Sequence, residues 1–233
     1  REPLQHETPG APPGTLLIAG DERPRIRLID YDERHFATHE IDDVEQIPAF
    51  LASEHPRVTW VDVHGIGHRP TFERIGEIFG IHPLALEDMV NVPQRPKSDA
   101  YDDHHLLVTR MVALDGDGLL VTEQLSILFS SRFVLTIQEE PKIDCLDPIR
   151  VRLRTSRGPM RKLGADHLAY AIVDAVIDAF YPVLEHFGEE LEELELRVTD
   201  LERPTASSQE IFRMKRELLS LRRAIWPQRE LLS

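Results

Sequence analysis

The chain has 233 residues, 41% of them hydrophobic, enough for one large domain or two smaller ones with a sizeable core. Its 41 acidic residues outnumber the 27 basic ones, and the resulting net charge of -14 disfavours nucleic acid and anionic lipid as partners and concentrates cations. The single cysteine, Cys145, excludes an internal disulfide framework and fits a reducing compartment.

The ends of the chain suggest a piece of a longer protein. No signal peptide opens the sequence, which begins with Arg1, and residues 229–233 stop inside a helical pattern without a Gly or Asn stop signal. No run approaches the ~18 apolar residues that a membrane helix needs. We therefore expect any membrane segments of the parent protein to lie outside this chain.

The first two thirds alternate short strands with short helices. Residues 1–14 are rich in proline and glycine and are predicted to be a disordered leader. A strand is predicted over 25–29 from polar and apolar alternation, and further strands are predicted over 36–41 and 58–63, with a helix over about 44–53. Residues 15–160 are therefore predicted to form a mixed α/β (α+β) layer structure.

Helix-capping and turn residues indicate where the next elements begin and end. Thr71 is expected to cap a helix that Gly80 ends, and Pro83 suits the first position of the following short helix. Strands are predicted over 105–114, 119–129 and 133–138, the first two joined by the Asp-Gly turn at 115–118. A basic helix should start at Asp147 and run to about Arg157.

Residues 161–233 are predicted to form long helices that pair as an antiparallel hairpin. A heptad seam runs along the first helix and a second seam follows a capping box at Ser207 and Glu210. Pro182 should bend the first helix, and Arg203-Pro204 should end it. The seam residues are Val173, Ile177, Phe180, Leu184, Phe187, Leu191, Leu194, Val198 and Leu201, then Ile211, Met214, Leu218, Leu221 and Ile225.

The two helices of this hairpin carry opposite charges, glutamates between 185 and 195 and basic residues between 213 and 223. These are interpreted either as complementary faces or as two ordinary solvated faces, because a surface ion pair contributes only ~0–1 kcal/mol.

Glu87 and Asp88 are the first candidate metal ligands. They lie late in a short helix, where the macrodipole is negative and two anions need compensation. Adjacent helical residues point ~100° apart, so the pair is suited to two ions or to one ion bound across an interface. The alternative is an acidic turn screened by Lys97 or Arg95.

Asp174 and Asp178 are the second candidates. They lie four residues apart on one face of the long helix, where like charges cost roughly 0.2–0.5 kcal/mol unless a cation binds. Mg²⁺ prefers oxygen ligands and keeps several waters, so one or two carboxylates suffice. The alternative is a polar stripe opposite the seam.

Two histidine groups could indicate zinc. His64 and His68 have the i, i+4 spacing of a zinc helix, but two glycines separate them and the segment is predicted to be a loop without a helical base. Asp103-His104-His105 is interpreted as the start of a strand. No phosphate-binding loop or supported nucleophile is present, which argues against an enzyme.

Seven motifs, in order along the chain, resemble the cytoplasmic domain of the CorA-type magnesium/cobalt transporter family from about Trp60 onward. The intact Gln94-Arg95-Pro96-Lys97 resembles the magnesium branch of that superfamily. The motifs are Trp60-Val61-Asp62 with Gly65; the block 79–97; Gln124-Leu125-Ser126; Asp147 to Arg150; Gly164 to Leu168; Ile172-Val173-Asp174 with Asp178; and 218–227 with Trp226-Pro227.

The resemblance implies an α/β/α sandwich with a mixed sheet, followed by long helices, assembled as a homopentamer in the full-length protein. A monomeric fragment is compatible with this expectation. Family carboxylates at the positions of Glu87, Asp88 and Asp174 contribute to regulatory Mg²⁺ sites at subunit interfaces, with partner carboxylates located beyond Ser233. The Gly-Met-Asn selectivity motif and two membrane helices are also expected beyond Ser233.

The predicted function is therefore the Mg²⁺-sensing and gating domain of a CorA-like channel or transporter, with Mg²⁺ as regulator and cargo and Co²⁺ as a further cargo. The parent would be an inner-membrane protein with this part in the cytoplasm. Three alternatives stay open: a zinc-transporting relative, a soluble zinc hydrolase using His64 and His68, and a helical scaffold without a metal role.

Overall fold

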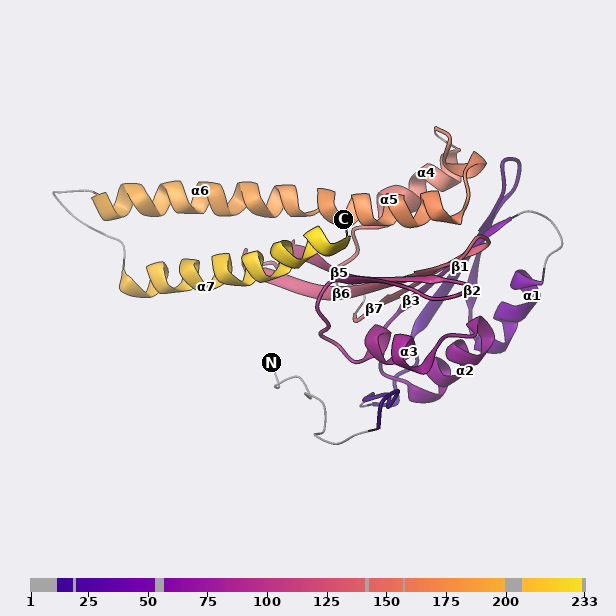
Figure 1. The fold of residues 1–233 in the computed structure, drawn as a ribbon. Coiled ribbons are helices and arrows are strands. Elements are labelled where there is room, and N and C mark those ends of the chain that lie inside the picture. Colours follow the sequence, from indigo (N-terminus) through magenta and orange to yellow (C-terminus); the bar gives the residue numbers. More distant parts are fainter. Residues whose placement is uncertain are drawn as a thin grey trace.

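A seven-stranded sheet forms the centre of the fold (Figure 1). The computed structural model describes residues 12–18, 20–52, 57–140, 143–156, 158–199 and 207–231. The strand order is β2-β1-β3-β7-β6-β5-β4, with β3 and β7 parallel and the other neighbouring pairs antiparallel, so the sheet is mixed. The strands are β1 Arg25–Tyr31, β2 Phe36–Ile41, β3 Val58–His64, β4 Lys97–Ala100, β5 His105–Leu114, β6 Leu120–Phe129 and β7 Phe133–Gln138.

Each central strand contributes to two cores, because successive side chains of a strand point to opposite faces. In β3, Val58 and Trp60 join one buried cluster, whereas Val61 and Val63 join the other. This strand is buried on both faces almost throughout, and apolar residues accordingly lie on both of them.

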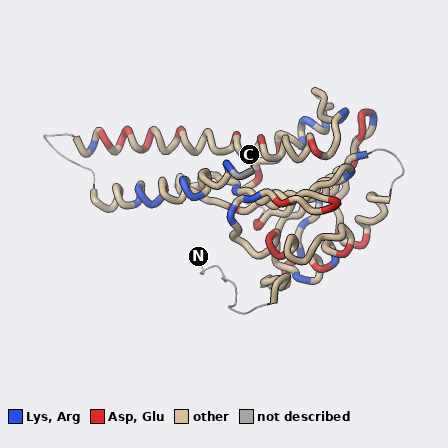
Figure 2. The backbone as a smooth tube through the Cα atoms, in the orientation of Figure 1, with Lys and Arg blue, Asp and Glu red and all other residues tan. Residues whose placement is uncertain are grey.

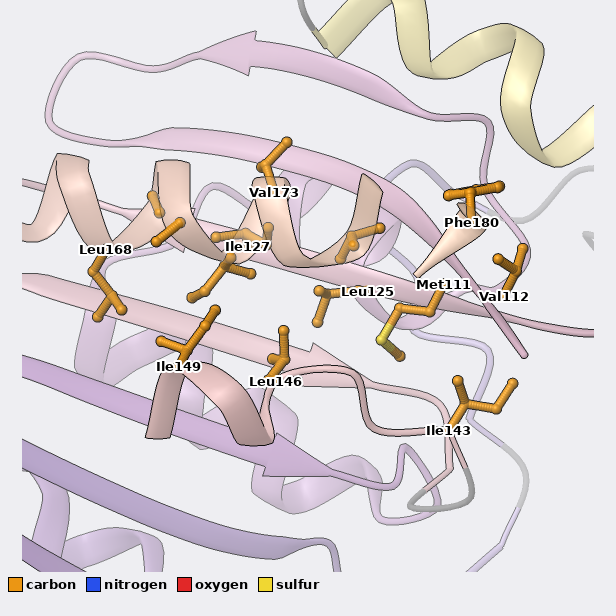
Figure 3. Packing of buried hydrophobic residues seen from close by; sticks show 14 of the residues in the cluster. Met111, Val112, Leu125, Ile127, Ile143, Leu146, Ile149, Leu168, Val173 and Phe180 are labelled. Carbon is orange, nitrogen blue, oxygen red and sulfur yellow. The ribbon is translucent and has the colours of Figure 1, made fainter. Parts of the chain in front are cut away.

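Helices cover both faces of the sheet (Figure 1). One face carries a 3₁₀ turn and the helices α1, α2 and α3, and the other carries α4 and α5. Figure 3 shows Leu168 of α5 and Ile149 of α4 among sheet residues such as Ile127. The bounds are Val44–Gln46 for the 3₁₀ turn, Ile47–Leu51 (α1), Arg69–Phe79 (α2), Pro83–Val90 (α3), Asp147–Thr155 (α4) and Ala165–Asp178 (α5).

Helices α6 (Phe180–Thr199) and α7 (Ser208–Ile225) form the predicted antiparallel hairpin, followed by the 3₁₀ segment η3, Trp226–Leu231 (Figure 1). A single residue, Ala179, separates the end of α5 from the start of α6. Pro182 lacks the N–H that would bond to the carbonyl of Asp178, which explains a break at this point. The predicted end at Arg203-Pro204 and the seam residue Leu201 lie outside the described residues.

The charges of the hairpin are distributed as predicted, with acidic residues along α6 and basic residues along α7 (Figure 2). Pairing between the two helices is sparse among the described residues: Arg213 lies 3.5 Å from Glu190, and a second bridge runs in the opposite sense, from Arg197 on α6 to Glu210 on α7 at 2.6 Å. In this described part, the second interpretation, of two mostly solvated faces, is therefore the better one.

The helical run Ala165–Thr199 is long and apolar enough to cross a membrane by length and composition, which corrects the expectation that no run comes near this limit. Burial in the core of the domain is another explanation for this apolar composition. Leu168, Ile172 and Val176 are fully buried in the cluster on the sheet, so this part of the run is a core helix.

Most local predictions are confirmed, and one is wrong. The predicted strands, Gly80 as the C-cap of α2 and Pro83 at the start of α3 are all observed. Thr71 does not cap α2, which begins at Arg69, and its hydroxyl instead bonds to the His68 ring. Strand β4 was not predicted, and Ser53, Arg157 and residues 1–11 of the predicted leader lie outside the described residues.

Candidate functional site

Helix α3 presents Glu87 and Asp88 because of residues that fix its start and its buried side. His82 caps the helix by accepting a hydrogen bond from the backbone N–H of Leu84, and Pro83 follows at the first position. Ala85, Leu86, Met89 and Val90 are buried against the sheet. The two carboxylates are consequently left half-buried on the outer side of the helix.

Asp88 is paired with a cation. Lys97 Nζ lies 2.6 Å from Asp88 Oδ2 and 2.9 Å from Asp99 Oδ2. Partial burial alone lowers the pKa of Lys97, but the hydrogen bonds to the two carboxylates outweigh burial and raise the pKa above its ordinary value. The ammonium therefore stays charged, as the alternative interpretation of this acidic turn requires, and a metal at Asp88 must compete with it.

Glu87 is held by a neutral donor instead. Its Oε2 accepts a 2.5 Å hydrogen bond from the backbone N–H of Gly14. Across the described part of the chain, no partner occupies its Oε1. The two neighbouring carboxylates thus differ in how available they are to an incoming cation.

The loop after α3 is fastened to the sheet by Gln124 and Ser126 of β6, both buried. The Gln124 amide donates to the carbonyl of Asp88 at 2.9 Å and accepts from the N–H of Gln94 at 2.6 Å. The Ser126 hydroxyl donates to the carbonyl of Met89 at 3.3 Å. These bonds satisfy carbonyls at the C-terminal end of α3 that a helix leaves without partners.

Asp174 and Asp178 lie on α5, on the opposite face of the sheet from α3 (Figure 1). Both are exposed, and neither forms a hydrogen bond or ion pair within the residues that the structure describes. The fold therefore does not bring the four predicted ligands together in one chain. Among the described residues, no group of three or more His, Cys, Asp or Glu side chains has the geometry of a metal site.

The histidines engage local partners. His64 ends β3 and its Nε2 lies 3.0 Å from Asp62 Oδ2, whereas His68 bonds to Thr71 at 2.8 Å. His104 is buried, which lowers its pKa, and His105 is the first residue of β5, as predicted. The structure therefore offers no support for a zinc centre at these positions.

A buried charge network was missed from the sequence. Asp62 of β3 is fully buried and lies 2.5 Å from Arg150 Nη2 of α4, itself 4% exposed. Thr136 donates to Asp62 at 2.7 Å. Arg150 also bonds to Asp144 and Asp147 and stacks 5.5 Å from the Trp60 ring. A charged residue inside the apolar run 58–63 was the available signal, since such a charge requires a partner.

A cleft of about 410 Å³ brings two further motifs together. Arg95, from the loop after α3, lies with Arg222, Arg223, Trp226 and Pro227 around it. The loop that follows the helix with the candidate ligands Glu87 and Asp88 is thus next to the C-terminal end of the hairpin.

Comparison with known proteins identifies relatives of the chain. The model of the family described as CorA-like Mg²⁺ transporter protein matches residues 56–233. The cobalt/magnesium transport protein CorA of Thermotoga maritima is 40% identical over 228 residues, which cover 96% of this chain and 64% of that protein. The chain thus spans a little under two thirds of that relative.

Solved structures share the fold at low identity. The complete CorA magnesium transporter from Methanocaldococcus jannaschii has a TM-score of 0.66 and 18% identity, over 88% of this chain and 61% of that chain. The ZntB cytoplasmic domain from Vibrio parahaemolyticus has a TM-score of 0.61 and 15% identity, over 89% of this chain and 77% of that chain. Both confirm the predicted sandwich followed by long helices.

Proposed function

Because the chain belongs to the CorA-like Mg²⁺ transporter family, we propose that it is the Mg²⁺-sensing and gating domain of a CorA-like divalent cation channel or transporter. The 40% identity to the Thermotoga cobalt/magnesium transport protein, over nearly the whole chain, is the observation that carries the proposal. Mg²⁺ would be both regulator and cargo, with Co²⁺ as a second cargo.

In the proposed assembly, the chain is one subunit of a homopentamer on the cytoplasmic side of the inner membrane, connected to the membrane by segments outside this chain. Glu87, Asp88, Asp174 and Asp178 would each supply part of a site that a neighbouring subunit completes. The placement of α3 and α5 on opposite faces of the sheet supports this, because carboxylates separated by the sheet need partners outside their own subunit.

The gating step follows from electrostatics. Carboxylates brought together between subunits repel each other, and a divalent ion between them stabilises one arrangement of the ring. A site with millimolar affinity supplies only ~4 kcal/mol at the standard state, so it empties when cellular Mg²⁺ falls. Equivalent sites acting on one two-state assembly sharpen the response. Emptying the sites should loosen the ring and favour conduction.

A zinc-transporting relative is the alternative within the same fold. The similarity to the ZntB domain concerns fold only, whereas the relative at 40% identity is named for cobalt and magnesium. The intact 94–97 motif also favours magnesium. Competitive uptake of Mg²⁺, Co²⁺ and Zn²⁺ by the full-length protein separates the two.

The sensing role is tested with Asp88→Ala and Asp174→Ala combined in the full-length protein. The Mg²⁺ concentration that half-protects the protein from a protease should rise at least about 10–100-fold, because losing two ligands costs no less than losing an outer hydrogen bond to one. Asp42→Ala combined with Asp102→Ala is a matched control, because it removes two exposed carboxylates that form no ion pair with any described residue and should leave the midpoint unchanged. An unchanged midpoint in the Asp88 and Asp174 variant refutes the sensor.

A further inference from the structure

Residues 12–18 form a segment that lies against α3, and it is called the N-terminal strap below. Its first four residues are Pro12, Pro13, Gly14 and Thr15, with Thr15 N–H donating to the Pro12 carbonyl at 3.2 Å. Gly14 has a φ of +84°. Proline at the second position and a positive-φ glycine at the third are the requirements of a type II turn, so the sequence itself encodes this turn.

The strap is fastened at several points. The Asn91 side chain, just after α3, accepts from the N–H of Leu17 at 2.7 Å and donates to the carbonyl of Thr15 at 2.9 Å. Leu16 is 6% exposed and belongs to the core beneath α3. The turn at Gly14 is therefore held in a defined place relative to the helix, and its N–H meets Glu87 Oε2.

We propose that the N-terminal strap is a positioning element for metal binding, in which the Gly14 N–H holds one oxygen of Glu87 and leaves the other for the cation. This rests on the proposed function of Glu87. Carboxylates that bind metals are commonly held by outer hydrogen bonds, and losing such a bond typically weakens metal binding by about 10–100-fold. A restrained glutamate also loses less side-chain freedom when the metal arrives.

The contrast with Asp88 supports this assignment. Asp88 is neutralised by Lys97 at 2.6 Å, so a metal must displace an ammonium before it binds there. Glu87 is oriented by a donor without net charge, and no cation forms an ion pair with it among the described residues. Of the two carboxylates, Glu87 is therefore the one that is already oriented for binding a cation, and the strap provides this orientation.

The test uses the full-length protein with Mg²⁺ protection from proteolysis as the readout. Gly14→Ala should displace the N–H, because its Cβ would lie 2.9 Å from Pro83 Cβ and the positive φ is unfavourable for alanine. Deleting residues 1–14 removes the N–H without that clash. Both should raise the Mg²⁺ midpoint about 10–100-fold. Gly116→Ala is the control, since nothing lies within 4 Å of its added Cβ.

A double-variant cycle separates positioning from general destabilisation. With Glu87→Gln in place, the deletion should cause no further change in the midpoint, because its effect acts through that carboxylate. If the strap only stabilises the fold, its deletion should raise the Mg²⁺ midpoint equally with and without Glu87→Gln, and this result would overturn the inference. The inference also fails if neither strap variant changes the midpoint. If the Asp88 and Asp174 variant has no effect either, the sensor proposal itself has failed.

Discussion

Replacing Arg150 with Met is expected to destabilise the domain strongly. Arg150 is 4% exposed and Asp62 is fully buried, so the variant leaves a buried carboxylate without its guanidinium partner. The partners that remain around Asp62 are Thr136 at 2.7 Å, the His64 ring at 3.0 Å and Gln138 at 3.5 Å, and none of them is a permanent cation. Breaking a buried ion pair on one side costs about 3–5 kcal/mol, a large share of the ~5–15 kcal/mol that stabilises a typical domain.

Urea unfolding of the purified chain measures this loss, with tryptophan fluorescence as the signal. The Trp60 ring is fully buried and lies 5.5 Å from the Arg150 guanidinium, so it reports on the affected region. The midpoint should fall without a change in slope, because the variant changes stability rather than the surface exposed on unfolding.

A second variant tests whether the unpaired charge of Asp62 causes the loss of stability. Asp62→Asn together with Arg150→Met removes both charges and should recover at least half of the loss, since replacing a buried pair is commonly near neutral. A loss below about 1 kcal/mol in Arg150→Met, or losses that simply add in the double variant, would show that the network is not a charge-compensated unit.

Three further predictions use the same unfolding assay. Burial alone would raise the pKa of Asp62, but the hydrogen bond from His64 and the charge of Arg150 outweigh it and hold the pKa at about 2. This lowered pKa contributes about 2 kcal/mol to the free energy of unfolding. The contribution is complete above about pH 4 and is lost as the pH falls towards 2, and Asp62→Asn should remove this pH dependence of stability. Gly80→Ala should cost about 1 kcal/mol through its φ of +62° alone, because nothing lies within 4 Å of the added Cβ; a neutral result would contradict the backbone argument. Ser207→Ala should cost about 1 kcal/mol by breaking the capping box of α7, with faster amide exchange confined to its first turn.

The elements were predictable because their signals are local. Apolar periodicity, glycine at helix ends and proline at helix starts act within a few residues, and the strands and helices follow them. The start of α2 was misplaced because Thr71 was treated as a cap, although Pro70, at the second helical position, indicates an earlier start. The four-residue β4 carries little alternation of its own and exists because it pairs with β5.

The contacts of the site were not predictable, because they join residues far apart in the chain. Gly14 meets Glu87 across 73 positions, and Arg150 meets Asp62 across 88. Lys97 was anticipated as a screen for this acidic turn, since it lies only nine positions after Asp88, across a short loop. Whether Glu87 and Asp88 bind metal stays a prediction that the experiments above test.

Several of the motifs that resemble the family contact one another in the structure. Asp62 in one motif is neutralised by Arg150 in another, and the end of α3 is fastened by Gln124 and Ser126 of a third. Such pairs explain why the pieces occur together, since a buried charge or an orphan carbonyl without its partner is costly.

A series of contacts also connects the proposed sensor to the C-terminal segment of the chain. Lys97, which contacts Asp88, begins β4, and β4 pairs directly with β5. Thr109 of β5 donates to the buried amide of Gln228 in η3 at 2.8 Å. A cation that displaces Lys97 from Asp88 therefore acts at one end of a hydrogen-bonded layer whose other end holds the segment after α7. Because packed layers transmit displacement rather than absorb it, we expect cation binding at α3 and movement of the C-terminal segment to be thermodynamically coupled, as the proposed gating by Mg²⁺ requires.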